Sequence, residues 1–70
     1  MTNRESRLQQ ARRHVAEGEQ RVLREKTLIA KLACDGHDTA AALSLLETLE
    51  RTLAVMLERL AEERQALGRP

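Results

Sequence analysis

Apolar residues recur along the chain in two long runs, with spacings that alternate between four and three residues. The later run comprises Ala42, Leu46, Leu49, Leu53, Met56 and Leu60, and extends through Glu63 to Leu67. The earlier run comprises Leu8, Ala11, Val15, Gly18, Val22, Glu25, Ile29 and Leu32. This 4-3 repeat is typical of coiled-coil-like helices that pack knobs into holes. It predicts two long α-helices, which meet along one apolar seam.

The segment 34–39, Cys-Asp-Gly-His-Asp-Thr, is the strongest helix break inside the chain. Gly36 can adopt the left-handed conformation that ends a helix, and Asp38 or Thr39 can cap the next one. At the start of the chain, Thr2 and Glu5 match a capping box. We therefore expect one all-α domain over 1–70, with a helix over 3–34, a turn over 35–38 and a helix over 39–67. The short connection makes the two helices antiparallel neighbours, a helical hairpin.

More leucine is present than one hairpin can bury. A domain of 70 residues buries only about 60% of its unfolded surface. Five leucines lie off the seam: Leu23, Leu28, Leu43, Leu45 and Leu57. They widen the apolar stripe beyond what one antiparallel helix covers. We therefore expect two hairpins to pair as a homodimeric four-helix bundle, with an unidentified protein partner as the alternative. The expected self-association residues are Leu28, Leu43, Leu45, Leu46, Leu49, Leu53, Met56, Leu57 and Leu60.

Two residues interrupt the earlier apolar run. Gly18 costs a helix about 1 kcal/mol relative to Ala. We expect Gly18 to let the second helix come close, with a hinge as the alternative. Glu25 occupies a core-type position. It is either an edge residue whose carboxylate reaches water, or a buried polar group that fixes register or oligomeric state.

The net charge is +1, but residues 1–33 carry eight basic and four acidic side chains. The basic residues of this half include Arg4, Arg7, Arg12, Arg13, Arg21 and Arg24. Two copies of such a helix could contact phosphates, which makes nucleic-acid binding the alternative function. The chain has no aromatic ring on which a base could stack. Glu17 with Arg21, and Glu47 with Arg51, have the order that favours ion pairs along a helix.

Little in the sequence points to catalysis or to a cofactor. Cys34 and His37 are spaced as half of a metal site, to which Asp35 or Asp38 could add an oxygen ligand. Each of these residues also suits a helix end or a turn. We expect no enzyme activity and no cofactor. A single cysteine fits a reducing compartment, and neither a secretory signal nor a membrane-spanning run is found, so we expect a cytoplasmic protein without membrane contact.

Two motifs carry a resemblance: Val15-Ala16-Glu17-Gly18-Glu19-Gln20-Arg21-Val22 and the turn Gly36-His37-Asp38-Thr39, followed by Leu45-Leu46 and Thr52-Leu53. Together they resemble a group of short, uncharacterised α-helical hairpin proteins of proteobacteria, over roughly residues 14–54. The resemblance implies a bacterial cytoplasmic source and no particular reaction. Cys34 and Glu25 depart from the pattern of that group. In architecture alone, the expected hairpin is also similar to the Rop family of RNA-binding regulators, whose hairpins dimerise into four-helix bundles.

Overall fold

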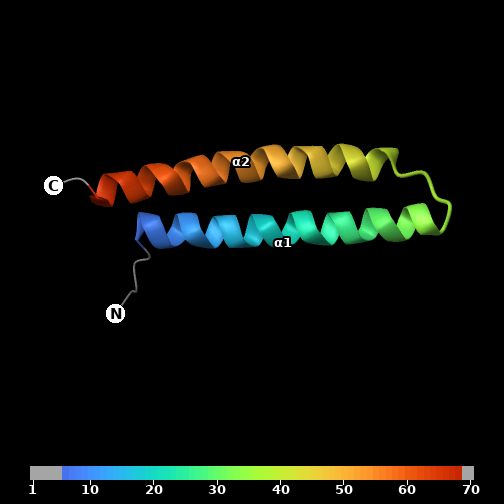
Figure 1. The fold of residues 1–70 in the computed structure, drawn as a ribbon, viewed down its shortest axis with the longest axis horizontal. Coiled ribbons are helices and arrows are strands. Elements are labelled where there is room, and N and C mark those ends of the chain that lie inside the picture. The colour runs from blue at the N-terminus through green and yellow to red at the C-terminus, as the bar shows by residue number, and fades with distance from the viewer. Residues whose placement is uncertain (1–5, 69–70) are drawn as a thin grey trace.

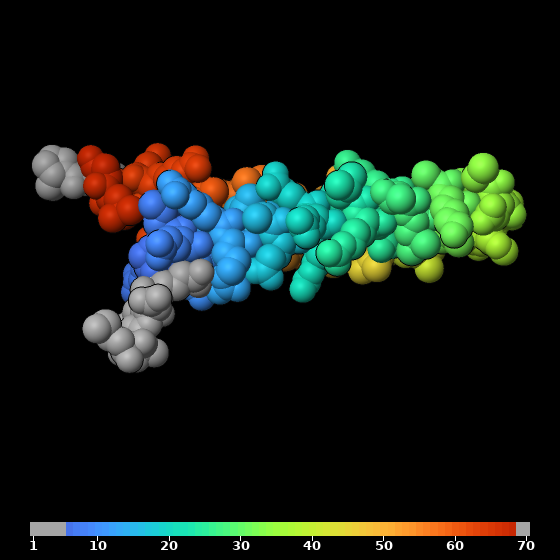
Figure 2. Space-filling model, turned by 90° about the horizontal axis from the view of Figure 1, so that it is seen from below, coloured from blue at the N-terminus to red at the C-terminus, as the bar shows by residue number. Residues whose placement is uncertain are grey.

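The computed structural model describes residues 6–68, which form two helices, α1 (Arg7–Cys34) and α2 (Ala40–Gly68). The helices lie side by side in opposite directions and are joined by one turn (Figure 1). In the view of Figure 2, α1 lies in front of α2 along most of its length, so the hairpin is a single layer of two helices. The molecule measures 55 × 28 × 13 Å. The predicted all-α hairpin is confirmed; its pairing into a four-helix bundle stays a prediction.

Helix α1 begins at Arg7, four residues later than the pattern predicts. Ser6 has extended backbone and caps the helix: its hydroxyl accepts from the Gln9 backbone N–H, and its own N–H donates to the Gln9 side chain, both at 3.1 Å. Such a capping box satisfies two backbone donors that a helix start leaves unpaired. The box expected at Thr2 and Glu5 lies outside the described residues.

Gly36 ends α1 as the sequence predicts, with a φ of +79°. The N–H of Gly36 donates to the Ala33 carbonyl at 3.1 Å, and the N–H of His37 donates to the Leu32 carbonyl at 2.9 Å. These two bonds define a Schellman motif, which satisfies carbonyls that a helix end leaves free. Because side chains with a Cβ rarely adopt this φ, the reversal of the chain depends on glycine at this position.

Asp38 and Thr39 accept hydrogen bonds from backbone N–H groups at the start of α2. The Asp38 carboxylate accepts from the Ala40 N–H at 2.9 Å. The Thr39 carbonyl accepts from the Leu43 N–H at 2.8 Å, which is the first backbone bond of the helix. The side chain of Asp38 therefore caps the helix, and Thr39 takes part through its backbone carbonyl.

Both 4-3 runs face each other across the hairpin, as predicted. Their buried members are Val15, Gly18, Val22 and Leu60. The half-buried members are Leu8, Ala11, Glu25, Ile29, Leu32, Ala42, Leu46, Leu49, Leu53, Met56 and Glu63. Leu67 is the exception, since 68% of its surface is exposed. The last turn of α2 extends past the start of α1 (Figure 1), so Leu67 has no turn of α1 beside it.

The two helices are in close contact at Gly18. A Cβ placed on Gly18 would lie 3.2 Å from both Leu53 Cδ1 and Met56 Sδ of α2. Gly18 therefore has the packing role that the sequence predicted, within a helix that runs without a break from Arg7 to Cys34. The contact fixes the register of the hairpin, because it sets which turn of α2 lies beside each turn of α1.

We predict that Gly18→Leu destabilises the protein by about 1–3 kcal/mol, because its side chain would push the two helices apart. Gly18→Ala is the matched control. Its methyl meets the mobile ends of Leu53 and Met56, and it gains about 1 kcal/mol of helix propensity, so its stability should stay within about 1 kcal/mol of the parent. Urea unfolding followed by circular dichroism measures both. Equal stability of Gly18→Leu and the parent would contradict the close packing.

We predict that Gly36→Ala lowers stability by about 1–2 kcal/mol, the cost of a left-handed conformation for a residue with a Cβ. No atom lies within 4 Å of the added methyl, so backbone strain is the cause of the loss. Gly68→Ala is the control, because its methyl also points into open space and its φ is not positive. Thermal unfolding should rank Gly36→Ala clearly below Gly68→Ala; the reverse order would refute the role of Gly36.

Candidate interaction surface

The apolar seam of the hairpin is incompletely covered. Val15, the most buried apolar residue, keeps 7% of its surface exposed, and no side chain of the described part is fully buried. The seam leucines expected to mediate self-association, Leu46, Leu49 and Leu53, are only half-buried against α1. One helix can cover only one stripe of its neighbour, so these side chains retain apolar surface that a second layer could cover.

The leucines that lie off the seam divide between two sides of the hairpin. Helical spacing places Leu28 and Leu45 on one side of the seam, and Leu43 and Leu57 on the other. Leu23 lies further round α1 on the side of Leu43. All five are exposed. They therefore lie on two sides of the hairpin and do not form the single broad stripe that the sequence suggested.

Three hollows line the side of the hairpin that carries Leu28 and Leu45, which we call the groove side. Their volumes are about 240, 350 and 220 Å³, and His14 lines all three. Neighbouring hollows share further walls, namely Met56 and Thr52 in one case and Ala11 and Arg59 in the other. They form one shallow groove that exposes the seam from the open end of the hairpin to its middle.

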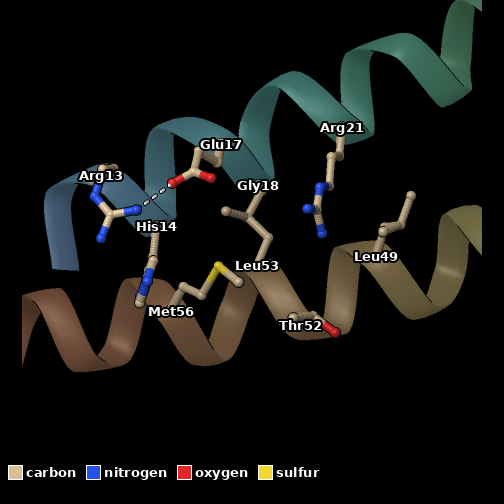
Figure 3. A pocket seen from close by; sticks show the side chains of 9 residues that line it. All are labelled: Arg13, His14, Glu17, Gly18, Arg21, Leu49, Thr52, Leu53 and Met56. Carbon is tan, nitrogen blue, oxygen red and sulfur yellow. Dashed lines mark hydrogen bonds and ion pairs between the residues drawn. The ribbon is translucent and has the colours of Figure 1, made fainter. Parts of the chain in front are cut away.

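The middle of this groove lies at Gly18. Figure 3 shows Leu53 reaching from α2 toward Gly18, with His14 and Arg21 of α1 extending toward α2 on either side of it. Leu49, Leu53 and Met56 provide an apolar floor. The floor is the part of the seam that the missing side chain of Gly18 leaves open. The groove therefore has an apolar floor, which lies against the α1 backbone at Gly18, and polar side chains along its rim.

The α1 rim of the groove is basic. Residues spaced by three and four form this row, which we call the α1 row: Arg7, Gln10, His14, Glu17, Arg21, Arg24, Leu28 and Lys31. Its single acid is Glu17. The sequence predicted that Glu17 pairs with Arg21, but Glu17 pairs with Arg13 at 3.1 Å. Of the arginines considered for nucleic-acid binding, Arg12 lies on the opposite side of α1, and Arg4 lies outside the described residues.

The α2 rim is uncharged from Ala41 to Val55, and Arg59 and Glu62 continue it toward the open end. This row, the α2 row, is a second 4-3 repeat one residue before the seam: Ala41, Leu45, Thr48, Thr52 and Val55. The Thr48 hydroxyl donates to the Ser44 carbonyl at 3.3 Å, and the Thr52 hydroxyl donates to the Thr48 carbonyl at 3.0 Å. With their donors satisfied, the threonines are less costly to remove from water. The 4-3 spacing of this row is present in the sequence, but its two threonines make the row resemble polar surface.

The remaining charged residues that the sequence singled out are exposed or lie at an edge. Glu25 is half-buried, and no charged side chain among residues 6–68 is buried, which favours the interpretation as an edge residue. Glu47 pairs with Arg51 at 2.7 Å, as predicted. More than two thirds of both side chains is exposed, so this pair adds little to stability.

The turn gathers fewer metal ligands than a metal site requires. Cys34 is a free and exposed thiol, and His37 is exposed. Within residues 6–68, no group of three or more His, Cys, Asp or Glu side chains is placed to hold a metal ion. A structural zinc site usually takes four ligands. The oxygen of Asp38 that was considered as a ligand accepts the hydrogen bond of the α2 cap instead.

No helix in the described part of the chain is long and apolar enough to span a bilayer. No family model, no curated protein and no solved structure matches the chain. The resemblance to short proteobacterial hairpin proteins therefore stays a prediction.

Proposed function

We propose that this protein is a non-enzymatic helical hairpin that acts by protein–protein contact, and that its first partner is a second copy with which it forms a four-helix bundle. The observation that carries the proposal is the uncovered seam along the groove side. We also propose a cytoplasmic location, which the free thiol of Cys34 supports because lone thiols fit a reducing compartment.

The surface of the hairpin is too large for a compact monomer of its mass. A folded monomer of 7.9 kDa is expected to expose about 4,400 Å². The hairpin exposes 5954 Å². Its radius of gyration is 16.3 Å, whereas a compact chain of 70 residues is expected near 11 Å. Stacking two such layers would bring both values toward those of a globular protein.

The arrangement of reactive groups supports a non-catalytic role. Cys34 and His37 lie at the turn, whereas His14 lines the groove near the open end. Acyl transfer and related chemistry need a nucleophile within hydrogen-bond reach of a base, inside a cleft that excludes water. Cys34 and His37 are exposed, and the groove at His14 is shallow, so neither place offers a cleft that excludes water.

If the hairpin self-associates, its thermal stability depends on protein concentration, because dilution favours the separated and unfolded chains. We predict that the melting temperature rises by roughly 10 °C for each hundredfold increase in concentration, given a typical unfolding enthalpy for two such chains. Circular dichroism at micromolar and at several hundred micromolar protein measures this rise. A melting temperature that is independent of concentration would contradict the proposal.

Nucleic-acid binding is the second candidate, and the basic α1 row is the observation that favours it. Phosphate contacts through Arg7, Arg21 and Arg24 would make binding strongly dependent on salt. We predict that Arg21→Gln with Arg24→Gln weakens any binding of duplex RNA at low salt, whereas Arg12→Gln on the opposite side leaves it unchanged. Fluorescence anisotropy measures both variants. Absence of binding by the parent at tens of micromolar protein would exclude this candidate.

A further inference from the structure

We infer that two hairpins pack through their groove sides with both turns at the same end of the bundle. This inference rests on the self-association proposed above and adds the surface and the orientation. The occupant of the groove side is a second copy of this chain, related to the first by a twofold axis that runs along the helices. In this arrangement, α1 of each copy packs on α2 of its partner.

The α2 row is the part of the groove side best suited to burial. It carries no charge from Ala41 to Val55, and its two threonine hydroxyls already donate to backbone carbonyls. The corresponding row of α2 on the opposite side, one residue after the seam, carries Glu47 and Glu50. Burying those charges would cost more than burying the α2 row. The uncharged row therefore favours the groove side over the side of Leu43 and Leu57.

The area of this face suffices for a stable dimer. Two adjacent helices of 28 and 29 residues, each about 10 Å in diameter, present a face about 42 Å long and about 20 Å wide. A typical stable interface takes about 800 Å² from each partner, which is comparable with the area of this face. The half-buried floor of the groove lies at the centre of this face, at Leu49, Leu53 and Met56. A second hairpin would cover it at the centre of the interface.

The leucines near the turn favour the same-end orientation. In the register that Gly18 sets against Leu53 and Met56, Leu28 lies opposite Leu45. With both turns at one end, these two leucines meet the same pair from the partner and form a four-leucine layer. With the turns at opposite ends and the two copies fully overlapped, α1 lies antiparallel on its own copy, and Leu28 falls near His14 of the partner subunit. Apolar surface is thus matched only in the first orientation.

Charge favours the same orientation. Four basic residues of the α1 row are exposed, and its one acid is already paired with Arg13. Opposite-end packing would stack this basic row on a second copy of itself, which is repulsive. Same-end packing places it instead along the α2 row of the partner. There the hydrocarbon stems of Arg21 and Arg24 can cover Thr52 and Thr48 while their charged groups reach water.

A matched pair of variants tests the surface. Leu45 and Leu43 are 49% and 50% exposed, lie in the first two turns of α2, and face opposite sides of the hairpin. We predict that Leu45→Lys weakens dimerisation about a hundredfold or more, because each dimer loses two buried leucines. Leu43→Lys should dimerise like the parent. Sedimentation equilibrium measures both, and circular dichroism confirms that both remain helical.

The native Cys34 tests the orientation, because it is exposed and is the sole cysteine of the chain. A spin label on Cys34 should give a distance between the two copies within about 30 Å, since neighbouring helices pack about 10 Å apart. Opposite-end packing would separate the labels by about 40 Å or more, the length of the 28-residue α1. Pulsed electron paramagnetic resonance of the labelled dimer distinguishes the two.

Each outcome has one meaning. Loss of the dimer in Leu45→Lys alone, with the short label distance, is the expected result. A parent dimer that Leu43→Lys dissociates, or that neither or both variants dissociate, overturns the assignment to the groove side while self-association stands. The long label distance overturns the orientation. A parent that stays monomeric at every concentration overturns the proposed function, and this inference with it.

Discussion

The contact of α1 with α2 at Gly18 determines how the rest of the hairpin is arranged. With no side chain at Gly18, Leu53 and Met56 of α2 pack directly against the α1 backbone. This contact sets the register, and the register in turn places Leu28 opposite Leu45. The same missing side chain leaves the seam open on the groove side. Close packing and the exposed groove thus have one cause.

A two-helix hairpin has a limit that follows from geometry. Each helix has a single neighbour, so only one stripe of each can be covered. The chain nevertheless carries apolar residues on both flanks of that stripe, and its core contains no fully buried side chain among the described residues. A second layer resolves this mismatch, and the uncharged α2 row shows where that layer fits best.

The sequence predicted the helices, the turn and the seam, because 4-3 spacing and a left-handed glycine depend on local rules. It misplaced the start of α1, since Thr2 and Ser6 begin the same sequence pattern, and α1 starts after the box at Ser6. It paired Glu17 with Arg21, although Arg13 is equally close along the helix. It also missed the α2 row, because threonines that bond to their own backbone resemble polar surface in a sequence.

The claim that the hairpin completes its core with a second copy is tested most directly by its mass in solution. Light scattering behind a sizing column, at two protein concentrations, measures it. The account predicts a mass near twice 7.9 kDa at the higher concentration. A mass of 7.9 kDa at both concentrations would contradict it, and the groove side would then have to be assigned to a different partner.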